Sequence, residues 1–183
     1  MRVGVLASGH GTILQALAGR DLPIAVVVVD RRCGAIDVAT EAGVSVELVE
    51  RRDFGPEFDR EAYTHDVIDA LRRHDVDLVA IAGFGTILSK PFIDAFGGRA
   101  VNTHPSLLPA FKGWHAVREA LEHGVKVTGC TVHMVTADVD EGPILAQESV
   151  PVLPDDTENS LHERIKEVER RLYPDVIERL ASA

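Results

Sequence analysis

The sequence predicts an α/β protein with a Rossmann-like, doubly wound and mostly parallel sheet of about seven strands, whose C-terminal strands are antiparallel. Short β-branched runs bounded by Gly, Pro or Asp recur along the chain. Helical stretches separate the first four runs, as parallel strands joined by crossover helices require. In the last two runs apolar and polar residues alternate, and an acidic turn joins the two runs. This pattern indicates that two antiparallel strands are added to the sheet.

The expected strands are the β-branched runs themselves. They lie at residues 2–7, 24–30, 44–49, 76–83, 100–103, 128–135 and 144–152. Near-continuous apolar runs such as AVVVV at residues 25–29 are typical of strands that are covered on both faces. We therefore expect helices on both sides of the sheet.

Helical periodicity is found between the strands and at the end of the chain. We expect helices at residues 12–19, 35–42 and 56–73. A final helix is indicated by one apolar stripe, formed by Leu161, Ile165, Val168 and Leu172. The pair Tyr173-Pro174 should break or kink this helix. Since the sequence has no repeat, low-complexity tract or linker, we expect a single domain over residues 1–183.

Composition limits the partners and the compartment. A formal net charge of −10 argues against nucleic acid or an anionic membrane as partner, because both require clustered Lys and Arg. A small anionic ligand in a local basic pocket is still compatible with this charge. Cys33 and Cys130 are too few for a disulfide framework, which suits a reducing cytosol. No apolar run approaches the roughly 20 residues of a membrane span, so we expect a cytoplasmic protein. We further expect a monomer or a homodimer.

The stretch LASGHGTILQAL, residues 6–17, connects the first strand to the first helix. It places Gly11, Thr12 and Ile13 at a helix start, where free N–H groups attract phosphate. The pattern is neither a full G-x-G-x-x-G nor a P-loop. A phosphate site and a plain tight turn therefore both fit these residues.

The stretch VNTHPSLLPAFKG, residues 101–113, sets Asn102 and His104 two positions apart at a strand end. Alternate positions of a strand point to the same face, so both side chains can donate to one oxygen atom. Two such donors suit an oxyanion that forms only in a transition state. Pro105 and Pro109 restrict the following loop, and Pro109 is the candidate for a cis peptide. The alternative is that the pair only satisfies backbone groups at the strand end.

An acidic turn lies in VTADVDEGPILAQ, residues 135–147, and contains Asp138, Asp140 and Glu141. Such a turn is often just solvated. In a functional interpretation, one carboxylate faces the Asn-His pair, where it keeps His104 protonated or orders a water that takes up a proton.

Lys166 and Glu169 lie one turn apart on the final helix. They could contact a phosphate and a sugar hydroxyl, or they could form a plain surface ion pair.

The sequence lacks the patterns typical of metal binding and of nucleophilic catalysis. Neither H-x-x-x-H nor H-E-x-x-H occurs, so we expect no metal site. The candidate nucleophiles Ser8, Ser106 and Cys130 do not sit in a G-x-S-x-G turn. Cys130 lies within an expected strand, where an inert buried thiol is the usual case.

Six motifs occur in the order found in one family: SGHGT, AGFGTIL, NTHPSLLPAFKG, GCTVHMV, VDEGPILAQ and ERRLYP. From Val3 to about Tyr173 the sequence resembles the folate-dependent formyltransferases, in their phosphoribosylglycinamide branch. The resemblance implies the formyltransferase fold and a transfer reaction in de novo purine (IMP) biosynthesis. In that reaction the amine of 5'-phosphoribosylglycinamide attacks the formyl group of 10-formyltetrahydrofolate directly, with oxyanion stabilisation and without a covalent enzyme intermediate.

The resemblance also implies roles for individual residues. The catalytic positions are Asn102, His104 and Asp140. The positions that bind the ribonucleotide are Gly11, Thr12, Ile13, Lys166 and Glu169. The positions that bind the folate co-substrate are Arg60, Gly85, Thr86, Ile87, Leu88 and Asn102.

The sequence departs from the family pattern in the folate segment. Where the family often reads Phe-Met-Arg-Ile-Leu, residues 84–88 read Phe-Gly-Thr-Ile-Leu. In the phosphate loop, Ile13 replaces a polar residue and offers only its N–H. Two alternatives share the fold, namely a 10-formyltetrahydrofolate hydrolase and a non-catalytic folate or nucleotide binder.

Overall fold

A seven-stranded sheet forms the centre of the computed structural model, which describes residues 1–182. The strand order is β3-β2-β1-β4-β5-β6-β7. The strands are β1 (Val3–Ala7), β2 (Ile24–Val29), β3 (Ser45–Leu48), β4 (Leu78–Ile81), β5 (Ala100–His104), β6 (Val127–Met134) and β7 (Ile144–Pro151). Strands β1 to β5 pair in parallel, whereas β6 and β7 are antiparallel to their neighbours. The predicted mixed sheet is confirmed.

The strand order reverses at β1, which lies between β2 and β4. The connections after β1 and β4 therefore leave the sheet in different directions and open a crevice at the carboxyl ends of these strands. Strand β5 borders this crevice and is paired in parallel with β4 and antiparallel with β6. In the β5–β6 pairing Asn102 lies opposite His133, and His104 lies opposite Thr131.

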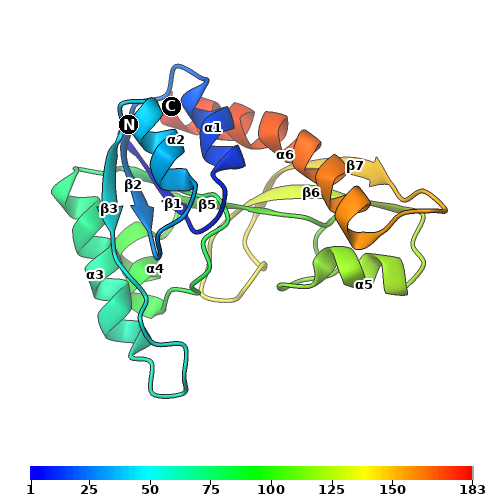
Figure 1. Cartoon of the computed structure of the whole chain (residues 1–183), viewed down its shortest axis with the longest axis horizontal. Coiled ribbons are helices and arrows are strands. Elements are labelled where there is room, and N and C mark those ends of the chain that lie inside the picture. The colour runs from blue at the N-terminus through cyan, green and yellow to red at the C-terminus, as the bar shows by residue number, and fades with distance from the viewer. Residues whose placement is uncertain (183) are drawn as a thin grey trace.

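Helices cover both faces of the parallel part of the sheet. Figure 1 shows α1, α2 and α6 on one side, and α3 and α4 on the other. The helices are α1 (Thr12–Ala18), α2 (Ala35–Glu41), α3 (Arg60–Arg73), α4 (Lys90–Phe96), α5 (Ala116–Glu122) and α6 (Glu158–Ala181). The short helices α4 and α5 were not predicted. No helix formed by residues 1–182 combines the length and the apolar character that crossing a bilayer demands.

Helix α3 begins four residues later than the periodicity predicted, at Arg60 rather than residue 56. Asp59 is the reason, because its side chain accepts the N–H of Ala62 at 2.9 Å and caps the helix there.

The core lies on both faces of the sheet, and β2 shows how the sequence divides it. Val27 and Val29 belong to the cluster that contains Leu14 of α1 and Tyr173 of α6. Val26 and Val28 belong to the opposite cluster, which contains helices α3 and α4. The apolar run of β2 is thus buried on both sides, as predicted. A smaller cluster joins α5, α6, β6 and β7 beyond β5.

Helix α6 does not end at Tyr173-Pro174, so the expected break is wrong. The helix continues through Pro174 to Ala181. A proline inside a helix costs roughly 3 kcal/mol. Beyond it Val176 and Ile177 are both buried against the core, and burial of such side chains contributes roughly 1.5–3 kcal/mol each. Burial therefore outweighs the proline.

Candidate active site

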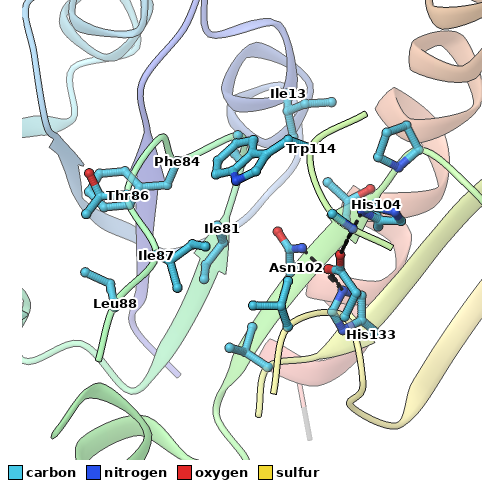
Figure 2. Close-up of a pocket in the computed structure, with 18 of the residues that line it drawn as sticks. Ile13, Ile81, Phe84, Thr86, Ile87, Leu88, Asn102, His104, Trp114 and His133 are labelled. Carbon is cyan, nitrogen blue, oxygen red and sulfur yellow. Dashed lines mark hydrogen bonds and ion pairs between the residues drawn. The ribbon is translucent and has the colours of Figure 1, made fainter. Parts of the chain in front are cut away.

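A cavity of about 510 Å³ opens at the carboxyl ends of β1, β4 and β5. Figure 2 shows side chains from these three strand ends around it. The turn between β6 and β7 and one face of α6 complete the wall. Five segments far apart in the sequence therefore meet at one place, and all but two of the predicted site residues line this cavity.

The loop after β1 contributes Gly11, Thr12 and Ile13 to the cavity wall. Gly11 is the N-cap of α1 and has a φ of 81°. A Cβ at this position would lie 2.9 Å from the Cα of Ala35, so only glycine fits the turn. The first N–H groups of α1 have no partner within the helix and can donate to a ligand.

His104 is buried at the end of β5, and both of its ring nitrogens lie beside oxygen atoms. Its Nε2 is 2.7 Å from the carbonyl oxygen of Phe111, and its Nδ1 is 3.4 Å from Oδ2 of Asp140. A neutral imidazole can donate to only one of these acceptors, whereas the imidazolium can donate to both. The two acceptors therefore flank the imidazole of His104 on both sides.

Asp140 lies in the turn between β6 and β7, with only 7% of its side chain exposed. Its Oδ1 is 3.4 Å from Nε2 of His133, and its Oδ2 accepts the N–H of Gly113 at 2.9 Å. Burial works to raise the pKa of Asp140, but the hydrogen bonds from His133 and Gly113 and the charge of His104 hold this pKa below its ordinary value. Asp140 is therefore a carboxylate at neutral pH, held between two imidazoles.

His133 is a site residue that the sequence did not reveal. It is buried on β6, with Nδ1 2.9 Å from the carbonyl oxygen of Met134 and Nε2 3.3 Å from Nδ2 of Asn102. It thus connects Asn102 to Asp140 (Figure 2). The available signal was a histidine among the β-branched and apolar residues of TVHMV. Its contact with Asn102 depends on the register of β5 and β6.

One face of α6 presents Lys166 and Glu169 to the cavity, together with His162. Lys166 pairs with Glu163 at 2.9 Å rather than with Glu169. Glu169 is half-buried and accepts the hydroxyl of Thr103 at 2.8 Å. Burial raises the pKa of Glu169, although this hydrogen bond opposes the shift. The surface ion pair between Lys166 and Glu169 that the spacing allowed does not form.

The segment after β4 provides Thr86, Ile87 and Leu88 to the cavity wall. Gly85 lies behind the wall, where its N–H donates to Oγ of Ser8 at 2.6 Å. Arg60 also lies outside the wall, but its Nη1 donates to the carbonyl oxygen of Ile87 at 2.7 Å. These two predicted residues therefore contact the cavity only through their neighbours.

The loop after β5 is held against the site. The Leu108-Pro109 peptide is cis, as predicted for Pro109. Lys112 forms an ion pair with Glu141, and Gly113 donates to Asp140. The next residue, Trp114, is the single tryptophan of the chain, lines the cavity and is 67% exposed.

Cys130 is buried on β6, and burial raises the pKa of its thiol to about 12. Because the thiolate is the nucleophile, this cysteine is inert at neutral pH, as predicted. Within residues 1–182, no group of three or more His, Cys, Asp or Glu side chains is arranged to hold a metal ion.

Comparison with known proteins defines the class to which this fold and site belong. Residues 1–177 match the family described as formyl transferase, and the chain belongs to this family. A phosphoribosylglycinamide formyltransferase of Mycobacterium tuberculosis is 50% identical, over 99% of this chain and 85% of that protein. The resemblance predicted from the motifs is confirmed.

Two further relatives support membership of this family. The crystal structure of glycinamide ribonucleotide transformylase 1 from Symbiobacterium toebii has a TM-score of 0.92 and 43% identity, and the match covers 100% of this chain and 88% of that one. The human trifunctional purine biosynthetic protein adenosine-3 is 40% identical over 99% of this chain, which corresponds to 18% of that longer protein.

Proposed function

We propose that this chain transfers the formyl group of 10-formyltetrahydrofolate to the amine of 5'-phosphoribosylglycinamide. Membership of the formyl transferase family and the names of its relatives support this reaction. The observation on which the proposal depends is the carboxylate of Asp140, held between His104 and His133 beside Asn102 in the cavity wall. This arrangement sets the amide of Asn102 near an imidazole that faces a carboxylate, and two such donors suit the oxyanion of acyl transfer.

The two substrates would approach the catalytic residues from different sides. The ribonucleotide phosphate would lie at the start of α1, near Gly11, Thr12 and Ile13, with Lys166 and Glu169 contacting phosphate and ribose. The folate would lie along Thr86, Ile87 and Leu88, with Arg60 near its carboxylate-bearing tail. Figure 2 shows Asn102 between Ile87 and His104, so the formyl carbon would be placed beside the amide.

In the reaction, the amine nitrogen forms a bond to the formyl carbon, and the formyl oxygen gains the negative charge. Asn102 donates to this oxygen, and His104 joins it when its Nε2–H leaves the carbonyl of Phe111. The carbon–nitrogen bond to the folate then breaks, and the folate nitrogen takes a proton while the attacking amine loses one. Asp140 keeps His104 protonated for this exchange. Each such donor contributes about 10²-fold or more to the rate.

A direct assay tests the function. Purified protein with both substrates at saturation should produce tetrahydrofolate and the formylated ribonucleotide in equal amounts. Omission of the ribonucleotide should stop the release of tetrahydrofolate. Formate release without the ribonucleotide would instead indicate the hydrolase, and binding of both substrates without turnover would indicate a non-catalytic binder.

A further inference from the structure

The cavity face of α6 contains His162, a residue to which the proposed function gives no role. This helix contributes His162, Lys166 and Glu169 to the cavity wall. His162 and Lys166 are four positions apart, so their side chains are neighbours on one face of the helix. Helix α1, whose start with Gly11 and Thr12 lines the same cavity, lies on the same side of the sheet as α6 (Figure 1). Two bases of α6 thus share a wall with the segment proposed for the phosphate.

The ring of His162 is half-buried, yet neither of its nitrogens has a hydrogen-bond partner among residues 1–182. The histidines with comparable or greater burial each have an acceptor or donor beside a ring nitrogen; these are His74, His104 and His133. Polar groups withdrawn from water are usually satisfied by hydrogen bonds. The imidazole of His162 therefore has a free donor and a free acceptor at the cavity wall.

The surroundings of His162 keep its imidazole neutral. Burial and the charge of Lys166 lower its pKa below the ordinary value, and Glu163 and Glu158 oppose this shift. The other elements of the cavity wall contribute further titratable groups, namely His10, His104, His133, Asp138 and Asp140. Because the ordinary pKa of histidine is about 6.5, the ring is mostly uncharged at pH 7.5. It gains a proton there only when additional negative charge arrives.

We propose that His162 is a further residue that binds the ribonucleotide phosphate, beside Lys166. This inference rests on the proposed function, because it assumes that the phosphate lies at the start of α1. A phosphate monoester has a charge of about −1.5 to −2 near neutral pH. Lys166 supplies one positive charge, which Glu163 partly neutralises at 2.9 Å. The second positive charge comes from His162, which takes up a proton from solvent as the phosphate binds.

The phosphate itself drives this protonation. An opposite charge within about 4–6 Å favours the imidazolium and raises the pKa of a histidine. Both ring nitrogens of an imidazolium are donors, and its hydrogen bonds to phosphate are roughly twice as strong as those between neutral groups. A ribosyl compound without the phosphate would leave His162 neutral. His162 therefore helps the chain to distinguish the ribonucleotide from its unphosphorylated counterpart.

The test is calorimetric titration of 5'-phosphoribosylglycinamide at pH 7.5, in two buffers with different enthalpies of ionisation, which counts the protons taken up on binding. The wild-type chain should take up about half a proton more than His162→Gln and should bind about tenfold more tightly. The matched control is His65→Gln, because His65 is exposed and lies outside the cavity wall. This control should match the wild type in both measurements. The compound without phosphate should bind the wild type and His162→Gln equally.

A second variant separates the charge of His162 from its packing. His162→Arg has a permanent cation, so it should bind within about threefold of the wild type and lack the additional proton uptake.

Equal proton uptake by the wild type and His162→Gln would overturn the inference, as would equal affinity of these two chains for the ribonucleotide. Either result would leave the proposed function standing if formyl transfer occurs. Failure of the wild type to bind the ribonucleotide would overturn the inference together with the proposed function. Binding with the expected proton uptake but without transfer would support the inference and count against the function alone.

Discussion

Oδ2 of Asp140 lies 3.4 Å from Nδ1 of His104 and accepts the N–H of Gly113 at 2.9 Å. One carboxylate oxygen thus holds both the imidazole and the loop that follows β5. In the proposed mechanism, replacing Asp140 by Asn removes the negative charge that stabilises the imidazolium of His104. We expect kcat to fall about 10²-fold or more, and the same for His104→Ala.

Steady-state kinetics at saturating substrates would measure the loss from Asp140→Asn. Asp155→Asn is the control, because Asp155 is exposed, lies outside the cavity wall and makes no ion pair within residues 1–182. The kcat of this control should stay within about twofold of the wild-type kcat. A near-normal kcat for Asp140→Asn would remove the assigned role.

His133 is expected to act through Asp140 rather than on the substrate. His133→Leu removes a hydrogen bond that holds the pKa of Asp140 low, so that pKa should rise. The ionised form of Asp140 is then lost at a higher pH than in the wild type. The acid limb of the kcat/KM profile should therefore move to higher pH, with about a tenfold lower kcat at neutral pH. An unshifted profile would mean that His133 is only structural.

Gly11 should be sensitive to a single methyl group, whereas Gly9 should not. Gly11→Ala places a Cβ 2.9 Å from backbone and at a φ of 81°, so we expect a loss of about 1–3 kcal/mol in the free energy of unfolding. Gly9→Ala meets no atom within 4 Å and serves as the matched control. Urea unfolding would measure both. Equal stabilities of the two variants would contradict the close packing of the α1 start on Ala35.

Glu169 should reduce stability at neutral pH because burial raises its pKa above the value in the unfolded chain. The folded state then holds its proton more tightly, so stability falls as pH rises through the folded-state pKa. Glu169→Gln should raise the Tm at pH 8, and this gain should vanish below about pH 4, where both states are protonated. Thermal unfolding of both proteins between pH 4 and pH 8 would measure this difference in Tm. A Tm gain that is independent of pH would contradict the account.

Much of the site was predictable because each motif is local in the sequence and the sheet brings the motifs together. Ligands of open α/β sheets bind at the carboxyl ends of the strands. This edge is where we expect the strand end with Asn102 and His104, the turn with Asp140 and the loop with Gly11. The alternation of side chains along β5 and the strand order of the sheet were enough to predict that these residues lie close together.

The rest depended on contacts that the sequence does not encode locally. His133 reaches Asn102 only through the β5–β6 register. Helices α4 and α5 have seven residues each, too few to show a helical period clearly. Pro174 stays inside α6 because the residues after it are buried, which helix propensity alone does not reveal.

Trp114 gives the protein an intrinsic optical reporter. An indole that is 67% exposed to water emits at long wavelength, and as the single tryptophan of the chain it has no background from others. A molecule that enters the cavity would displace water from this ring. The emission should then shift to shorter wavelength, and each ligand could be titrated alone, without turnover and without a label.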